Sequence, residues 1–255
     1  MGRILYDHKY TNQAPLIVLE GADGVGKTTL ADEIVTILEF VDIDAISTRE
    51  PGSPTSTACC LIRTVLAQTD LTPDEEKLLF CADRLIHHRT VISPALKEGF
   101  AVVSDRGPLS TFVYQTLNRE GSVVRCEGDV LRKLNDNTFF DVTVVLKRED
   151  SSEDIVLLTR DEDSDHMATR AAKQKEAVRE AYNYVADACM STYANNEYVL
   201  GSEVSQAGTT MTTAITIKEE DTEFATALRI IDRVVALCER NNACVEFVSK
   251  WPGLK

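Results

Sequence analysis

The sequence predicts an α/β fold in which a mainly parallel, five-stranded sheet is flanked by helices on both faces. Short, continuous apolar runs, typical of strands buried on both sides, alternate along the chain with longer segments of helical periodicity. This alternation produces βαβ units and hence parallel strands. The expected strands are residues 16–19, 45–48, 100–104, 142–146 and 198–200.

The helices are expected between these strands, and one of them has a well-marked beginning. Thr72 can cap the first turn, Pro73 suits the first helical position, and Glu75 completes a capping box. This helix should kink or restart at Pro94 and end at Gly99. The other helices are expected at residues 28–40, 55–67, 110–117, 128–135, 151–160, 169–190 and 223–240.

The length and composition fit a single compact domain over residues 1–255. Apolar residues make up 44% of the chain and charged residues 27%, which is ordinary for a globular protein. Within the domain we expect an N-terminal arm at residues 1–14 and a C-terminal tail at residues 241–255. The segment 201–221, which is rich in Thr and Ser, is a possible insertion.

The sequence favours a cytoplasmic protein with reduced thiols. No apolar run approaches the ~20 residues that span a bilayer, and the polar N-terminus lacks the apolar core of a signal peptide. The seven cysteines are odd in number, and their spacing suggests neither a zinc site nor a redox pair. The net charge of −14 argues against binding a nucleic acid polymer, so any phosphate site must be locally positive.

A phosphate-binding loop is the strongest motif. Residues 21–28, GADGVGKT, match the pattern of two glycines separated by four residues and followed by Lys and Thr. Lys27 supplies a charge to the outer phosphates, and Thr28 supplies a hydroxyl to Mg²⁺. The expected ATP contacts are Gly21, Asp23, Gly24, Val25, Gly26, Lys27, Thr28 and Thr29.

The position of the motif argues against a chance glycine-rich turn, because it lies between an apolar strand and a helix, as phosphate binding requires. The fold expected is therefore a three-layer P-loop NTPase fold. GTPases, helicases and transporters share this loop. The chain lacks an Asn-Lys-x-Asp guanine signature and is small for a motor, so small-molecule kinases remain.

Charged residues follow two of the predicted strands. Asp105 and Arg106 come after residues 100–104, and Arg49 comes after residues 45–48. The carboxyl ends of parallel strands are where ligands collect, so Asp105 could support Mg²⁺ and the arginines could bind a second phosphate. Taken alone, these residues could equally form a surface ion pair and an ordinary turn.

Phe80 and Arg84 are four residues apart on one predicted helix and so share a face. An aromatic ring beside a guanidinium could stack on a nucleobase and donate to its edge. Taken alone, the pair more often consists of a core aromatic and a solvated charge.

Together these motifs resemble the thymidylate kinase family, in its bacterial branch, across about residues 16–200. Besides the phosphate-binding loop, the matching segments are Thr48-Arg49-Glu50-Pro51-Gly52, Leu78-Leu79-Phe80-Cys81-Ala82-Asp83-Arg84, Asp105-Arg106, Leu109-Ser110-Thr111 and Tyr114-Gln115. The resemblance implies transfer of a phosphoryl group from ATP, with Mg²⁺, to a pyrimidine deoxynucleoside monophosphate. It also implies a homodimer.

The resemblance assigns roles around the acceptor's phosphate and sugar. Arg49 and Arg106 would bind the phosphate, and Asp105 would support the metal. Asp23 would reach the 3′-hydroxyl, and Tyr114 would crowd the 2′ side and favour deoxyribose.

It also assigns roles around the base. Phe80 would stack on thymine, Arg84 would donate to a thymine carbonyl, and Thr111 or Gln115 would read the ring edge. The implied acceptor site consists of Asp23, Arg49, Phe80, Arg84, Arg106, Ser110, Thr111, Tyr114 and Gln115.

Two segments depart from the family pattern. The residue after Asp105-Arg106, usually aromatic or His, is Gly107. The expected lid, residues 160–168, is acidic where the family carries several arginines. Arg160 is the candidate for a catalytic arginine, with Arg170 in reserve. The expected catalytic residues are Lys27, Asp105, Arg106 and Arg160.

The sequence therefore predicts a thymidylate kinase that makes dTDP from dTMP and ATP. One alternative is a kinase for another deoxynucleoside monophosphate, such as a 5-modified dUMP, with a pocket altered near Gly107 and Pro108. The other is a non-catalytic nucleotide-binding module, against which Lys27, Thr28 and Asp105 argue.

Overall fold

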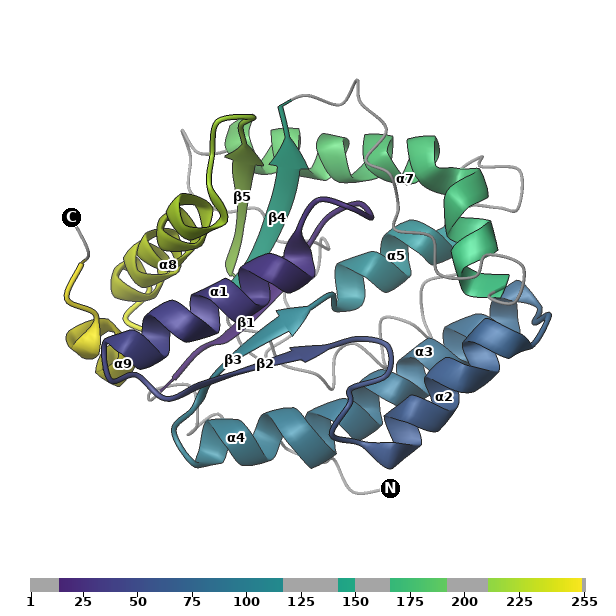
Figure 1. Ribbon diagram of the computed structural model, residues 1–255, viewed down its shortest axis with the longest axis horizontal. Coiled ribbons are helices and arrows are strands. Elements are labelled where there is room, and N and C mark those ends of the chain that lie inside the picture. Colours follow the sequence, from purple (N-terminus) through teal and green to yellow (C-terminus); the bar gives the residue numbers. More distant parts are fainter. Residues whose placement is uncertain (1–13, 117–141, 150–165, 192–210, 254–255) are drawn as a thin grey trace.

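The computed structural model describes residues 14–116, 142–149, 166–191 and 211–253. Its centre is a sheet whose described strands are all parallel, in the order β2-β3-β1-β4-β5 (Figure 1). The strands are β1 (Leu16–Glu20), β2 (Ala45–Arg49), β3 (Ala101–Asp105), β4 (Val142–Arg148) and β5 (Met211–Ile217). The predicted fold class and the first four strands are confirmed.

The fifth strand differs from the prediction. Residues 198–200, expected to form it, lie outside the described part of the chain, whereas Met211–Ile217 pairs in parallel with β4. The segment 201–221, predicted as a possible insertion, thus contains a strand that its sequence did not reveal. The physical reason is that β5 is an edge strand. It is only partly buried, so it lacks the continuous apolar run that marks the inner strands.

The helices largely follow the predicted positions. They are α1 (Lys27–Phe40), α2 (Thr57–Gln68), α3 (Pro73–His87), α4 (Ser93–Lys97), α5 (Pro108–Thr116), α7 (His166–Ser191), α8 (Glu223–Arg240) and α9 (Val245–Lys250). The capping box at Thr72 and Glu75 is present. The helices expected at 128–135 and 151–160 lie outside the described residues.

A π-helical turn, η2 (His88–Ile92), separates α3 from α4. Pro94 has no N–H to donate to the carbonyl of Thr90, and its ring disfavours a regular α-helix there. The helix therefore widens before Pro94 and restarts at Ser93, as the sequence predicts. Gly99 follows with a φ of 90°, in the left-handed region.

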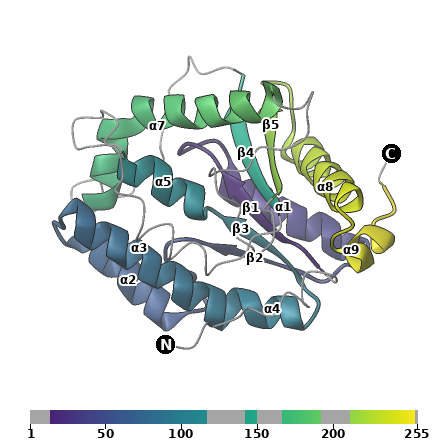
Figure 2. The same cartoon turned by 180° about the vertical axis from the view of Figure 1, so that it is seen from behind.

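Alternate residues of β1 point into two cores. Ile17 and Leu19 pack with α1 and α8 on one face of the sheet. Leu16 and Val18 face Ile92 and α4 on the other, where α5 and α7 pack beside them on β4 and β5 (Figure 2). These faces give the three layers, and every strand directs its carboxyl end to the same edge.

The segment after α8, expected to be a tail, contains the short helix α9. Phe247 of α9 is buried in the core, and the Trp251 ring nitrogen donates to Asp232 of α8 at 2.9 Å. Within the described residues, no helix combines the length and apolarity needed to cross a membrane.

Candidate active site

The loop of residues 21–26 joins β1 to α1 and depends on its glycines. Gly26 precedes α1 with a φ of 100°, and a Cβ at Gly21 would lie 2.8 Å from the Leu146 carbonyl oxygen. No side chain caps α1, so the amides of its first turn face the loop, as anion binding requires. Val25 contributes backbone only, because its side chain is in the core.

Lys27 folds back over this loop. Its Nζ donates to the carbonyl oxygens of Gly21 at 3.0 Å and Ala22 at 2.8 Å. Burial, together with the charge of Arg106, lowers the pKa of Lys27 to about 8. A phosphate placed in the loop would favour the charged form of this amine and would replace the carbonyls as its partner.

Thr28 and Asp105 form a pair of oxygen ligands between α1 and β3. The Thr28 hydroxyl donates to Oδ2 of Asp105 at 2.5 Å. The other oxygen, Oδ1, is buried and has no hydrogen-bond partner among the described residues. A hydroxyl beside an orphaned carboxylate oxygen is the ligand chemistry that Mg²⁺ prefers, so these residues fit the ion. The described residues contain no cluster of three His, Cys, Asp or Glu, so further ligands would be phosphates and water.

Arg106 is the centre of a polar cluster at the end of β3. Its Nη2 donates to Oδ1 of Asp23 and, at 3.3 Å, to the Tyr114 hydroxyl, which itself donates to Oδ2 of Asp23 at 2.8 Å. Arg106 has a φ of 76°, a left-handed conformation that costs a non-glycine residue about 1 kcal/mol or more. Burial would raise the pKa of Asp23, but the charges of Arg106 and Lys27 hold it below its ordinary value.

Glu20, which the sequence analysis did not select, supports this cluster from behind. It is fully buried and accepts from the Ser110 amide at 3.0 Å, the Ser110 hydroxyl at 2.6 Å and the Tyr182 hydroxyl at 3.1 Å. Ser110 also accepts from Nη1 of Arg106 at 2.9 Å. Burial raises the pKa of Glu20. The only sequence signal was an acidic residue that ends a buried apolar strand immediately before the loop.

Arg49, the last residue of β2, lies at the same edge of the sheet. Arg49 pairs in register with Asp105, and the Glu50 amide donates to the Asp105 carbonyl at 3.0 Å. Nε of Arg49 lies 3.5 Å from the Gly52 carbonyl oxygen. Gly52 has a φ of 85°, and a Cβ there would lie 2.5 Å from the Arg63 side chain, so the turn requires glycine.

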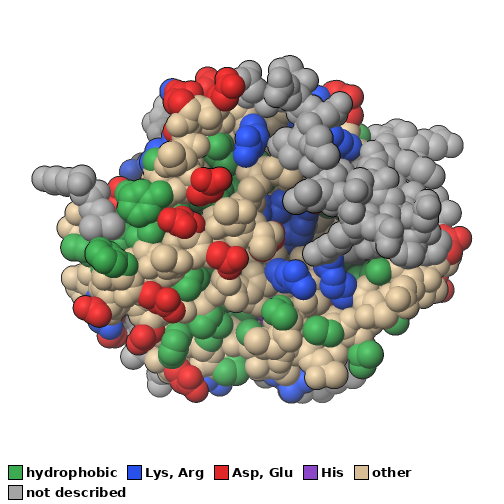
Figure 3. Space-filling model, viewed as in Figure 1, with side chains coloured by type: hydrophobic (Ala, Val, Ile, Leu, Met, Phe, Trp, Pro, Cys, Tyr) green, Lys and Arg blue, Asp and Glu red, His purple; other side chains and the backbone are tan. Residues whose placement is uncertain are grey.

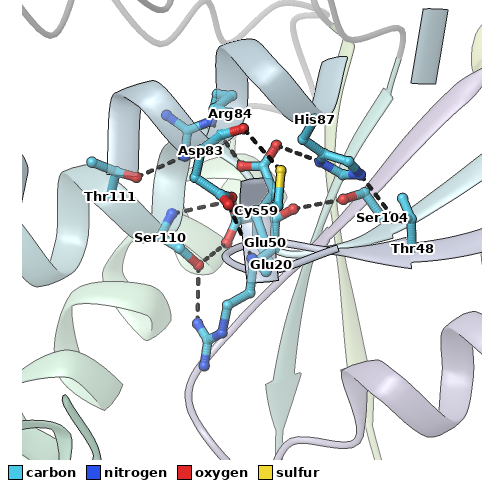
Figure 4. A network of polar contacts seen from close by, with 12 residues as sticks. Glu20, Thr48, Glu50, Cys59, Asp83, Arg84, His87, Ser104, Ser110 and Thr111 are labelled. Carbon is cyan, nitrogen blue, oxygen red and sulfur yellow. Dashed lines mark hydrogen bonds and ion pairs between the residues drawn. The ribbon is translucent and has the colours of Figure 1, made fainter. Parts of the chain in front are cut away.

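Arg84 is buried, so the alternative of a solvated charge is wrong. Only 3% of Arg84 is exposed, and its Nε donates to Oε2 of Glu50 at 2.8 Å. Its Nη2 donates to the Thr111 hydroxyl at 2.7 Å. Figure 4 shows Arg84 between these two partners. Phe80, one turn earlier on α3, is half-buried.

The positive residues gather although the chain is acidic. Figure 3 shows Lys and Arg side chains in and around a hollow near the centre of one face, while many acidic side chains lie over the half that carries α1 and α8. The locally positive site required by the net charge of −14 is therefore present.

A family model for thymidylate kinase matches residues 19–199, which is most of the chain. The chain belongs to the thymidylate kinase family. This agrees with the resemblance noted across about residues 16–200.

Curated relatives that resemble the chain carry the name thymidylate kinase. The chain is 44% identical over 106 residues to the "Probable thymidylate kinase" of Methanoculleus marisnigri, covering 42% of this chain and 49% of the relative. It is 40% identical over 128 residues to the thymidylate kinase of Francisella tularensis subsp. novicida, covering 49% of this chain and 58% of the relative. The chain thus matches about half the length of these curated relatives.

A solved structure supports the fold. The crystal structure of thymidylate kinase from Ehrlichia chaffeensis superposes with a TM-score of 0.57 at 23% identity, covering 87% of this chain and 98% of that one. At this identity the likeness concerns the fold.

The structure brings most of the family's expected site residues to one edge of the sheet, but it does not describe all of them. Arg160 lies outside the described residues, and so do the side chains of Gln115 and Arg170. Gly107 departs from the family pattern, and a Cβ there would lie 2.7 Å from Cγ1 of Val18. Val18 therefore already fills the space next to Gly107.

Proposed function

We propose that this chain is a thymidylate kinase that transfers the terminal phosphoryl group of ATP to dTMP, giving ADP and dTDP. The observation that carries the proposal is the juxtaposition, at one edge of the sheet, of a phosphate-binding loop with three arginines on separate elements. Lys27 belongs to the loop, and the arginines are Arg49, Arg106 and Arg84. Family membership supports the same reading.

On the donor side, the loop amides and Lys27 bind the ATP phosphates and keep the terminal group in place. Thr28 and Asp105 would hold Mg²⁺, which would neutralise charge on the phosphates. Lys27 leaves the carbonyls of Gly21 and Ala22 for the phosphates, and its ammonium offsets the charge on the transferring group.

On the acceptor side, Arg106 and Arg49 bind the phosphate of dTMP as forked donors. Asp23 accepts from the 3′-hydroxyl once Arg106 turns to the phosphate. Phosphoryl transfer needs little covalent help from the protein, so alignment of the two phosphates and charge neutralisation account for most of the catalysis.

At the base, Phe80 stacks on the ring and Arg84 donates to a carbonyl. A donor aimed at a thymine carbonyl would face the amino group of cytosine, which is itself a donor. Each such buried mismatch costs about 1–3 kcal/mol. A Cβ at Gly107 would face Val18 and Glu20, so Gly107 gives no specific support to a pocket enlarged for 5-modified dUMP.

An ADP-release assay over a panel of monophosphates tests the proposal. We expect dTMP to exceed dCMP and dGMP by at least ~100-fold in kcat/KM, because mismatched buried groups are costly. A preference for a 5-modified dUMP would favour the alternative acceptor, and no ADP release with any monophosphate would indicate a non-catalytic module. Light scattering would test the homodimer, which we propose from family resemblance alone.

A further inference from the structure

The turn that follows Arg49 is fastened to the helix that carries Arg84 by a buried polar network. Glu50 lies at its centre. Oε2 of Glu50 accepts from Nε of Arg84 at 2.8 Å, and Oε1 lies 3.2 Å from Nδ1 of His87 (Figure 4). Nε2 of His87 lies 2.7 Å from the Thr48 hydroxyl.

The contact with Glu50 defines the proton on one ring nitrogen of His87. A carboxylate can only accept, so Nδ1 of His87 carries the proton and donates to Glu50. Nε2 shares a hydrogen bond with the Thr48 hydroxyl. Burial would raise the pKa of Glu50, but the charge of Arg84 and the bond from His87 hold it below its ordinary value, so Glu50 is ionised.

The network is buried throughout. The exposed fraction is 6% for Glu50, 3% for Arg84, and zero for His87. An ion pair in such a place gains little net stability over an apolar pair, so stability alone does not explain why these residues are used. Fixing a geometry is the better-supported use of such a pair, and here the fixed group is the guanidinium of Arg84.

The guanidinium is held at two separate nitrogens. Nε is bonded to Glu50 on the turn, and Nη2 is bonded to Thr111 on α5. Two anchors on a rigid planar group define its plane as well as its position. A second bond between turn and helix, from the Gly52 amide to Oδ1 of Asp83 at 3.1 Å, fixes the turn itself.

We propose that Glu50 is a positioning residue for acceptor recognition: held by His87, its carboxylate fixes Arg84 relative to Arg49, the neighbouring residue that ends β2. The base-reading and phosphate-binding arginines thereby keep a set separation. An acceptor must match that separation to engage both. This proposal rests on the proposed function, because it assumes that Arg84 and Arg49 contact one acceptor.

The experiment compares Glu50→Gln with the wild type and with Asp232→Asn, an acid-to-amide control on α8 at the carboxylate that accepts from Trp251. Glu50→Gln keeps the size of the side chain but loses its charge. We expect KM for dTMP to rise about 10- to 100-fold, the range for losing a hydrogen bond to a charged group, with KM for ATP within about twofold. The preference for dTMP over dCMP should fall at least about 10-fold. The control should match the wild type.

A second pair of variants separates positioning from bulk stability. His87→Asn keeps an N–H near the position of Nδ1, so it should retain KM for dTMP within about threefold of the wild type. His87→Leu removes the donor at similar volume and should behave like Glu50→Gln. Melting temperatures measured alongside would show that each variant is folded.

Equal increases of both KM values, or an unchanged KM for dTMP in folded Glu50→Gln, would overturn the proposal. If the wild type itself releases no ADP with dTMP, the proposed function fails instead. Crystal structures of the wild type and Glu50→Gln then test the positioning separately. A displaced Arg84 guanidinium is expected, and an unmoved one would contradict the role of Glu50.

Discussion

The buried lysine of the phosphate-binding loop should destabilise the free protein, and replacing Lys27 with Met tests this. The ammonium group is nearly buried, with 6% of the residue exposed. Burial and the charge of Arg106 lower its pKa from 10.5 to about 8. The folded protein therefore holds this proton less tightly than the unfolded chain does, which reduces the free energy of unfolding at pH 7.

The size of the effect follows from the pKa. One pKa unit corresponds to about 1.4 kcal/mol, so the fall from 10.5 to about 8 corresponds to about 3 kcal/mol. This cost is complete below pH 8 and disappears as the pH rises from 8 to 10.5, where only the unfolded chain keeps the proton. Lys27→Met removes the cost but also the bonds to Gly21 and Ala22, worth about 1 kcal/mol each.

The variant should therefore be about 1 kcal/mol more stable than the wild type at pH 7 and about 2 kcal/mol less stable above pH 10.5, by the same arithmetic. Urea unfolding of both proteins from pH 7 to above pH 10.5 measures the difference between their free energies of unfolding. Groups that titrate identically in both proteins do not contribute to this difference. A difference that does not change with pH would refute the reasoning, since it would mean that Lys27 keeps an ordinary pKa. The variant should also release no ADP.

The remaining predictions concern the acceptor, the metal and the catalytic arginine. Arg84→Ala should raise KM for dTMP far more than KM for ATP, and equal effects would mean that α3 does not face the acceptor. Asp105→Asn should raise the Mg²⁺ concentration for half-maximal rate about 10-fold or more, and an unchanged titration would remove Asp105 from the metal site. Arg160→Ala should lower kcat at least ~100-fold with little change in dTMP affinity, whereas Arg170→Ala should have a smaller effect. Single-turnover kinetics on the two variants measures this, and wild-type transfer rates in both would require a positive charge from elsewhere.

Elements with a strong local signal were predictable from the sequence. The strands β1 and β3 each begin with a continuous apolar run, and α3 begins with a complete capping box. The edge strand β5 was not predictable in this way. Its MTTAITI sequence is half-buried and has no apolar run, so only its pairing with β4 defines it. Helix α9 is short, and its core contact through Phe247 depends on α8 already being in place.

The residues of the candidate site also differ in how well local sequence patterns predict them. Lys27 and Thr28 belong to a local motif, so spacing alone was sufficient to select them. The environment of Arg84 was not readable locally, because its partner Glu50 comes from a turn 34 residues earlier. Glu20 and Tyr182 are 162 residues apart, and nothing in either segment indicates that the other faces it. Contacts of this range arise from the sheet order, which local patterns do not encode.

The position of Arg106 explains how an acidic chain can prepare a phosphate site. In the free protein this guanidinium is already paired, to Asp23 directly and to Glu20 through Ser110. In the proposed function, an acceptor phosphate replaces Asp23 on this guanidinium, so it gains only the difference between two charge-assisted bonds. Glu20 is buried behind the cluster and stays in place through the exchange, which keeps Arg106 oriented. Asp23, once released, is an ionised hydrogen-bond acceptor for the sugar's 3′-hydroxyl. In the proposed function, the Arg106–Asp23 ion pair of the free protein thus supplies the contacts to both the phosphate and the sugar of the substrate.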